Sequence, residues 1–342
     1  MSEEGSSNRS QEEWTAFDEI LKMGNPITEI SVYQGAHIET LFKAAHHSKH
    51  LKSLDLQLAD GVSESLDMNS LKGFPNLQEM SLVVDCENDS YLANFSFFSL
   101  EKMQSMTHLK SVSLYFDGDP SDVESLLRKA LSKLTDLTHL TLRFPNMIDF
   151  EDRYKDYDDG EKLSWSWLKK AFQEVGKMKK LKDFYLEFEN FNFRGASGIF
   201  KSLCQAFGNL TQLSSLQLKL EEAEAIKDKD MCTLADALPK LTRVESLSLS
   251  LGSTKFKPGT FAVLMDSLVK NLRILSELNL KIRRSDVTKQ CYQAVEEGIH
   301  KMKCLNKMKL EVGGTIGRGV NMELLDAAVH KRMAGEVYSL GY

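Results

Sequence analysis

Three histidines, His46, His47 and His50, are the first residues of this 342-residue chain whose type and spacing could bind a metal ion. On a helix, His46 and His50 would share one face, because residues four apart lie one above the other. A zinc site needs a third ligand of clear spacing, and none accompanies this pair. The cluster favours solvated histidines at the end of a helix, and we expect no metal site.

A glycine-rich segment, Gly313–Gly319, could in principle cradle a phosphate, since it follows a strand-like segment and precedes a helix-like one. Its sequence, Gly-Gly-Thr-Ile-Gly-Arg-Gly, matches neither the dinucleotide fingerprint nor the lysine-containing phosphate loop. A flexible connection is the favoured interpretation. The chain also has no Gly-x-Ser-x-Gly, Cys-x-x-Cys or His-Glu-x-x-His motif. We therefore expect no catalytic residues, no cofactor and no enzymatic activity.

An acidic segment, Asp149–Glu161, is the largest irregularity in the chain and carries Tyr154 and Tyr157 among its charges. It does not match a calcium-binding loop, because the glycine is placed so that a lysine would be the first ligand. Two hypotheses remain open. The segment is either a disordered surface insert or a loop that contacts a partner, with Tyr154, Tyr157 and Asp158 as contact residues.

A short sequence phrase, Leu-x-x-Leu-x-Leu-x-apolar, occurs nine times and indicates the secondary-structure elements that must position any site. All four marked positions are apolar in every copy, as in Leu51, Leu54, Leu56 and Leu58. The copies begin at Leu51, Leu77, Leu109, Leu137, Leu181, Leu213, Val244, Leu275 and Leu305. Such regular recurrence is typical of a tandem-repeat architecture.

This phrase resembles the leucine-rich repeat, over roughly residues 27–312. Copies start 26 to 44 residues apart, which leaves room for a strand, a loop and a helix and is similar to the long, ribonuclease-inhibitor-like class. The resemblance implies a curved solenoid used for protein recognition. Eight residues after each opening leucine, however, the asparagine or cysteine that the family uses to tie its turns is absent. We expect the longer apolar strands to hold the turns instead.

Each repeat should place a strand against a helix. Residues two apart on a strand point to one side, so one strand face is apolar and the other polar. Apolar residues at three- and four-residue spacing predict helices with one buried face at Ser121–Leu134, Ser164–Met178, Ser197–Phe207, Phe261–Leu272 and Lys289–Met302. Helices are wider than strands, so the predicted fold is an α/β horseshoe, with parallel strands on the concave face and helices on the convex face.

The polar strand face is the candidate binding surface. Aromatic residues and arginine contribute most to binding energy at protein interfaces. The predicted contact residues on this face are Tyr33, Tyr115, Arg143, Tyr185, Glu187, Lys219 and Lys281. The alternative is a merely solvated face. Capping segments are predicted at each end, which gives the domain boundaries 1–26, 27–312 and 313–342.

Composition narrows the function further. A net charge of −6 argues against a general nucleic-acid binder, and no apolar run is long enough to cross a membrane. The five cysteines, an odd number without paired spacing, and the polar, acidic N-terminus predict a cytoplasmic protein, with the nucleus, cytoskeleton or cilium as alternatives. The hypothesis is a non-catalytic scaffold or adaptor that binds a protein partner. The alternatives are a regulator of a GTPase or ubiquitin ligase, and a structural component of a large assembly.

Overall fold

A computed structural model describes a subset of the 342 residues, which falls into eleven ranges: 28–33, 50–58, 74–85, 106, 108–117, 131–144, 166–189, 198–221, 227–251, 257–283 and 289–313. The chain divides between Leu137 and Thr138 into two compact units, unit 1 and unit 2, which are described separately.

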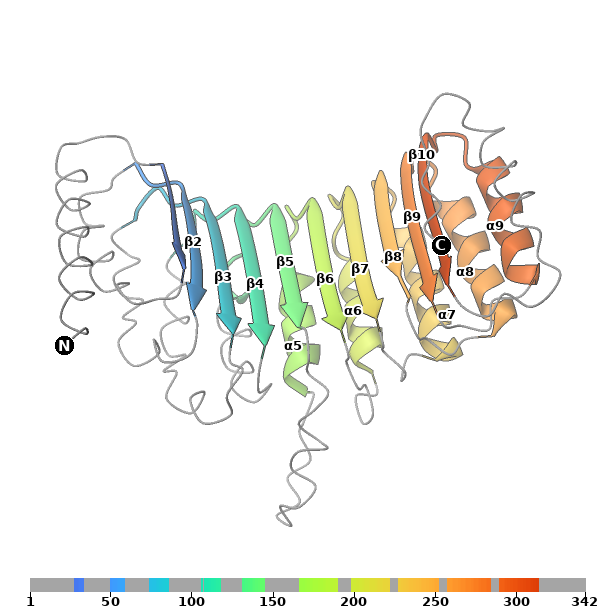
Figure 1. The fold of residues 1–342 in the computed structure, drawn as a ribbon, viewed down its shortest axis with the longest axis horizontal. Coiled ribbons are helices and arrows are strands. Elements are labelled where there is room, and N and C mark those ends of the chain that lie inside the picture. The colour runs from blue at the N-terminus through green and yellow to red at the C-terminus, as the bar shows by residue number, and fades with distance from the viewer. Residues whose placement is uncertain are drawn as a thin grey trace, which may run out of the picture. The chain divides into compact units, whose positions relative to one another are not determined.

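In the described part of unit 1, four parallel strands follow one another in space as they do in the sequence. They are β1 (Glu29–Tyr33), β2 (Ser53–Leu58), β3 (Glu79–Asp85) and β4 (Ser111–Asp117) (Figure 1). Side chains alternate along each strand. On β2, for example, Leu54 and Leu56 are buried while Asp55 is partly exposed. One face of this sheet therefore forms a core and the other is polar.

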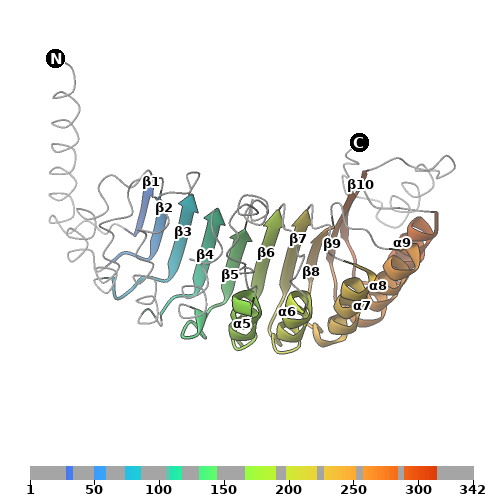
Figure 2. The same ribbon diagram turned by 90° about the horizontal axis from the view of Figure 1, so that it is seen from below.

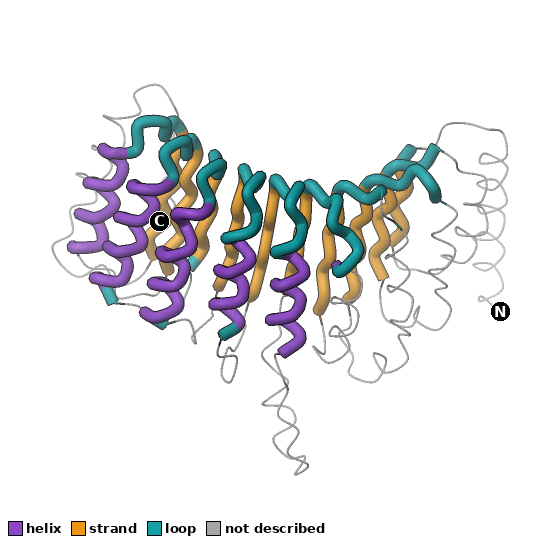
Figure 3. The backbone as a smooth tube through the Cα atoms, turned by 180° about the vertical axis from the view of Figure 1, so that it is seen from behind, coloured by secondary structure: helices purple, strands orange, loops and turns teal. Residues whose placement is uncertain are grey.

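Unit 2 repeats a strand and a helix in turn. Its elements are β5 (His139–Phe144), α5 (Ser166–Val175), β6 (Asp183–Glu189), α6 (Ile199–Phe207), β7 (Ser215–Glu221), α7 (Asp228–Ala237) with the short 3₁₀ turn η4 (Leu238–Lys240), β8 (Ser246–Ser250), α8 (Pro258–Asn271), β9 (Glu277–Arg283), α9 (Lys289–Lys301) and β10 (Lys307–Gly313). Neighbouring strands pair in parallel. Helices α5–α9 lie together on one face of the sheet (Figures 2 and 3).

The predicted α/β solenoid of parallel strands and helices is confirmed in its element order. Each of strands β2–β10 begins two residues after the opening residue of its phrase, as β6 does after Leu181. Helices α5, α6, α8 and α9 agree with their predicted ranges to within three residues. Helix α7 was not among the predicted ranges, and most of the predicted helix Ser121–Leu134 lies outside the described residues. Helix α8 begins earlier than predicted, at Pro258, because a proline in the first turn lacks only an N–H that the helix does not use.

The core contains a further recurring apolar position that was not recognised as part of the repeat. Three residues before eight of the nine phrases, within the described residues, lies a buried side chain whose carbonyl accepts a hydrogen bond from the N–H of the phrase's first residue. Met178, for example, accepts this bond from Leu181 at 3.0 Å. The position is occupied by Phe74, Met106, Leu134, Met178, Leu210, Leu241, Leu272 and Met302. The repeat therefore starts one turn earlier than the recurring phrase.

Main-chain hydrogen bonds tie successive repeats together where the strands begin. The carbonyl of Lys182 accepts two of them, from the N–H groups of Ser214 and Ser215, at 2.8 and 2.9 Å. The same double acceptance recurs at Thr28, Lys52, Gln78, Thr138, Ser214, Glu245 and Ser276. The asparagine or cysteine that ties the turns of the family is absent here, and backbone hydrogen bonds between successive repeats form a ladder at this edge of the sheet.

Several predictions fall on residues outside those described. They are His46 and His47, most of the glycine-rich segment, the acidic segment Asp149–Glu161 and both capping segments; His50 is exposed. Curvature over the whole chain stays a prediction. None of the described helices is both long and apolar enough to cross a membrane.

Candidate functional site

The polar face of unit 2 is formed by the strand side chains that point away from helices α5–α9, and is called here the open face. Strand alternation creates it: Leu140, Leu142 and Phe144 of β5 are buried, while Thr141 and Arg143 between them are partly or largely exposed. Because the six strands are parallel and in register, equivalent residues of successive repeats lie side by side on this face.

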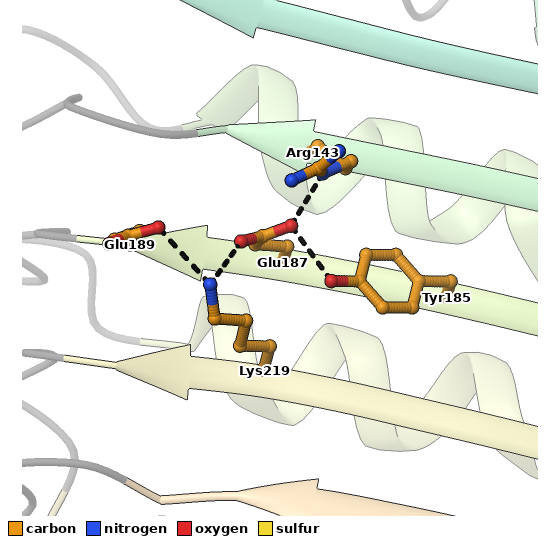
Figure 4. Close-up of polar contacts among 5 residues, drawn as sticks. All are labelled: Arg143, Tyr185, Glu187, Glu189 and Lys219. Atoms are coloured by element: carbon orange, nitrogen blue, oxygen red, sulfur yellow. Dashed lines mark hydrogen bonds and ion pairs between the residues drawn. The ribbon is translucent and has the colours of Figure 1, made fainter.

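Glu187 of β6 is the centre of a hydrogen-bond network on the open face (Figure 4). Its Oε2 accepts hydrogen bonds from Arg143 Nε at 2.5 Å and from the Tyr185 hydroxyl at 2.8 Å. Its Oε1 accepts one from Lys219 Nζ at 2.6 Å. Lys219 also donates to Glu189 Oε2 at 3.2 Å. We call these five residues the Glu187 network.

Strand register explains why these side chains meet. Arg143 of β5 pairs with Glu187, and Glu187 pairs with Lys219 of β7. Neighbouring strands lie about 4.8 Å apart, so residues in register on the same face are within reach of each other's long side chains. A cation, an anion and a cation thus stand in one row, and attraction acts across both strand boundaries.

Glu187 is buried although it belongs to the polar face. Its side chain is 1% exposed, whereas those of Arg143 and Lys219 are 44% and 28% exposed. A buried carboxylate is costly unless it is paired and hydrogen-bonded. Burial pushes the pKa of Glu187 upward, but the hydrogen bonds from Lys219, Arg143 and Tyr185 outweigh it and hold the pKa below its ordinary value. Glu187 is therefore ionised at neutral pH.

The partners of Glu187 hold their protons firmly. Burial, and then the hydrogen bond to Glu187, raise the pKa of Tyr185 to about 12. Burial lowers the pKa of Lys219, but the hydrogen bonds to Glu187 and Glu189 outweigh this and raise it above its ordinary value. A general acid or base works best with a pKa near the operating pH. This arrangement suits fixed positioning of charge better than proton transfer.

An aromatic cluster supports the network from the core side of the sheet. The rings of Phe144 and Phe188, on β5 and β6, stack with centroids 5.2 Å apart. Trp167 packs edge-on against Phe144 at 6.1 Å, and Phe172 against Phe188 at 6.5 Å. Large buried rings resist displacement because interiors are close-packed. The strands that carry Arg143 and Glu187 are therefore held rigidly.

Other ion pairs on the open face are more exposed. His139 of β5 lies 2.7 Å from Asp183 of β6, Lys307 lies 3.4 Å from Glu277, and Lys309 lies 2.5 Å from Glu311. Exposed pairs of this kind contribute little to stability. The Glu187 network differs from them because its central charge is buried.

Four of the predicted contact residues lie in the Glu187 network, and two lie elsewhere on described strands. The side chains of the others lie outside the described residues. Arg143, Tyr185, Glu187 and Lys219 come together in one network, which Glu189, not predicted as a site residue, completes. Lys281 lies on β9, in register with Ser250 and Glu311, and is partly exposed.

Tyr115 lies on β4 of unit 1, in register with Val83, and is partly buried. The backbone of Tyr33 belongs to β1, but its side chain lies outside the described residues, as do Tyr154, Tyr157 and Asp158.

The described residues include histidines, carboxylates and three cysteines, which are the residue types that bind metal ions or react as thiols. Among the described residues, no three histidine, cysteine or acidic side chains gather as they would around a metal ion. Cys204 is buried, and burial raises the pKa of its thiol to about 12. Cys232 is partly buried, and Cys304 is exposed. A thiol as hard to ionise as that of Cys204 is a poor nucleophile.

Comparison with solved structures gives distant similarities. Actin-binding site 2 of leiomodin-1 is 13% identical, with a TM-score of 0.35, over 48% of this chain and 85% of that one. A Bacteroides fragilis protein is 15% identical, with a TM-score of 0.41, over 76% and 66% of the two chains.

A chain of the yeast Rad7–Elc1 complex is also 15% identical, with a TM-score of 0.42, over 92% of this chain and 76% of that one. No protein-family model and no curated protein sequence matches this chain.

Proposed function

We propose that this protein is a non-catalytic scaffold or adaptor that binds a protein partner through the open face of unit 2. The observation that carries the proposal is the burial of Glu187 beneath side chains that remain exposed. Its three hydrogen bonds, all within the chain, fix the positions of Arg143, Tyr185 and Lys219.

Fixed side chains favour binding because less conformational freedom is lost when a partner arrives. Without these hydrogen bonds, the side chains of Arg143 and Lys219 would lose rotational freedom about several bonds when a partner binds. Here both are restrained by Glu187 and by strands that an aromatic cluster supports. Tyrosine and arginine are also the residues most often found to dominate binding energy at protein interfaces. These features support protein recognition better than a merely solvated sheet.

Two further attributes belong to the proposal. The long repeats, each with a helix where unit 2 is described, support the ribonuclease-inhibitor-like class of leucine-rich repeats. The odd number of cysteines supports a cytoplasmic location, because secreted proteins usually pair their cysteines.

A site-specific blocking experiment tests the open face. Thr141→Arg combined with Gln217→Arg adds two bulky cations to the open face without replacing a residue of the Glu187 network. The matched control, Gln173→Arg with Gln205→Arg, adds the same charges to exposed positions on α5 and α6. A photo-crosslinking amino acid at position 217 or 205 identifies the partner, and calorimetry then measures its affinity.

The open-face double variant should weaken partner binding at least tenfold, since clashes at a close-packed interface are costly. The helix-face control should change affinity by less than about threefold. Loss of binding in the control alone would place the interface on the helices and overturn the proposal.

A further inference from the structure

We infer that unit 2 has a second binding surface, along the edge of the sheet where its strands begin, and that this surface binds an acidic polypeptide segment. The surface consists of five loops that lead from a helix into the next strand: residues 176–182, 208–214, 238–245, 272–276 and 302–306. We call it the basic edge; Figure 3 draws these loops in teal between the helices and strands. It is separate from the open face and goes beyond the proposed function.

The basic edge is positively charged, although the chain as a whole is negatively charged. The chain as a whole has a net charge of −6, yet the five loops contain eight cations and one carboxylate, Glu245. All eight cations are exposed: Lys177, Lys179, Lys180, Lys182, Lys240, Arg243, Arg273 and Lys303. Basic side chains are therefore concentrated on one edge of unit 2.

The loops are held at a regular spacing. The backbone ladder joins each loop to the next, as when Glu245 accepts hydrogen bonds from Ser276 and Glu277 at 2.8 and 2.9 Å. Neighbouring strands lie about 4.8 Å apart, so five loops span about 19 Å. Four of the five loops carry cations, because residues 208–214 contain none. For the three successive loops 238–245, 272–276 and 302–306, the strand spacing is shorter than the screening length of about 8 Å in physiological salt, so their cations act together on an anion.

Some of these cations are already engaged within the chain. Lys177 pairs with Glu174 at 2.7 Å, Lys179 donates to the carbonyl of Asn209 at 3.2 Å, and Arg243 donates to Gln212 at 2.7 Å. Others are not. Within the part of the chain that the structure describes, the side chains of Lys182, Lys240 and Arg273 make no hydrogen bond or ion pair. Three cations on three different loops are thus available to a partner.

The composition of the basic edge favours a polypeptide over a nucleic acid. The five loops contain no aromatic residue on which a base could stack. Six of the eight cations are lysines, whereas arginine is the residue whose geometry best fits a phosphate. Lysine, a compact charge on a flexible stem, pairs readily with a single carboxylate.

The apolar content and length of the basic edge also fit a peptide. Ile274, between Arg273 and Leu275, is 41% exposed and could pack against one apolar side chain of the partner. One such residue is too little apolar surface to anchor the edge in a lipid membrane. An extended peptide advances about 3.3 Å per residue, so about six residues span the five loops. The inferred partner is an extended segment of roughly that length, rich in aspartate and glutamate.

Binding of a fluorescent peptide of about eight glutamates to the full-length chain tests the inference, because such a peptide is longer than the roughly six residues needed to span the edge. The test variant is Lys182→Gln, Lys240→Gln and Arg273→Gln. The matched control is Lys170→Gln, Lys201→Gln and Lys229→Gln, which removes the same charge from helices α5, α6 and α7. Thermal melting checks that both variants fold.

The test variant should bind the peptide about tenfold more weakly than the parent, because three exposed charge contacts are lost, and the control should stay within about twofold. Equal weakening in both variants would reduce the effect to net charge and overturn the inference. The open-face variant Thr141→Arg with Gln217→Arg should bind the peptide at least as well as the parent. This result separates a failure here from a failure of the proposed function.

Two competitors test the chemistry of the partner. A single-stranded oligothymidylate with the same number of charges, and vesicles of phosphatidylcholine with phosphatidylserine, are titrated against the peptide complex. Both should displace the peptide more weakly than unlabelled peptide does. Tighter binding of either competitor through the same three residues would assign the basic edge to a nucleic acid or a membrane, and would refute the polypeptide.

Discussion

Arg143 donates a hydrogen bond from Nε to Glu187 Oε2 at 2.5 Å, across the boundary between strands β5 and β6 and a separation of 44 residues. The bond joins an exposed cation to a buried anion. Such a pair is asymmetric: removing the cation leaves a charge in the interior, whereas removing the anion leaves a charge in water.

Replacing both cations should be more damaging than replacing all three charges. Arg143→Met with Lys219→Met leaves Glu187 buried with only the Tyr185 hydroxyl as a donor, and should lower the free energy of unfolding by about 3–5 kcal/mol. Adding Glu187→Met to that double variant should recover most of the loss. Urea denaturation followed by circular dichroism measures both. A triple variant less stable than the double would contradict the asymmetry.

Tyr185 should ionise only in strong alkali. Its pKa in the folded chain is about 12, above the ordinary value of about 10. Since the folded value is the higher one, the interaction stabilises the fold fully below the unfolded pKa, and this contribution is lost as pH rises from about 10 through about 12. The difference in tyrosinate absorbance between the parent and Tyr185→Phe measures the titration. Glu187→Gln should shift the Tyr185 pKa back toward 10.

Asp228 should make the start of helix α8 sensitive to acid. Its Oδ1 accepts hydrogen bonds from the Thr260 hydroxyl at 2.6 Å and the Lys257 N–H at 2.7 Å, and these two bonds hold its pKa below the ordinary value. The stabilisation is present above the unfolded pKa of about 3.9 and is lost as pH falls through the folded value.

Hydrogen exchange in the first turn of α8, measured at neutral and acidic pH, tests this role of Asp228. Asp228→Ala should exchange faster at both pH values. Asp228→Asn, which keeps an acceptor without a charge, should lose the pH dependence. Asp266→Asn, at a residue that pairs with Lys270 later in α8, is the control and should leave the first turn unchanged.

Leu216→Ala should destabilise unit 2 locally. Leu216 is fully buried on β7, so the substitution opens a cavity that should cost about 2–5 kcal/mol. Repeats contact mainly their neighbours, and hydrogen exchange should therefore increase first in β6, β7 and β8. Gln217→Ala, on the exposed side of the same strand, should change stability by less than about 0.5 kcal/mol. Uniform acceleration along the chain would contradict the repeat mechanism.

The sequence predicted the strands well because each strand needs an alternating apolar pattern that is visible in a single copy. The two-residue offset between Leu181 and the start of β6 recurs in every later repeat. Met178 was assigned only to the end of a predicted helix, and its recurrence in the same place before each described phrase was not recognised, because the apolar residues of a helix and of a strand have different periods. The apolar pattern of a strand alone does not indicate the turn before it, which the hydrogen bond from Leu181 to the Met178 carbonyl closes.

The candidate site was only partly predictable. Arg143, Glu187 and Lys219 occupy the same position in successive repeats, so parallel register alone places them in one row. Their alternating charges were visible in the sequence. The burial of Glu187 was not, because it depends on how Tyr185 and Lys219 fold over the carboxylate. Pattern assigns a residue to a face, but three-dimensional packing decides its exposure.

The backbone ladder at the starts of the strands has a consequence for how such a chain can evolve. Its donors and acceptors are peptide groups, present in almost every residue, so one repeat recognises the next without any particular side chain at that edge. A duplicated copy of about thirty residues would meet the same acceptors on one side and offer the same donors on the other. Lengthening by gene duplication is thus open to this chain, while the exposed loop residues are free to diverge toward new ligands.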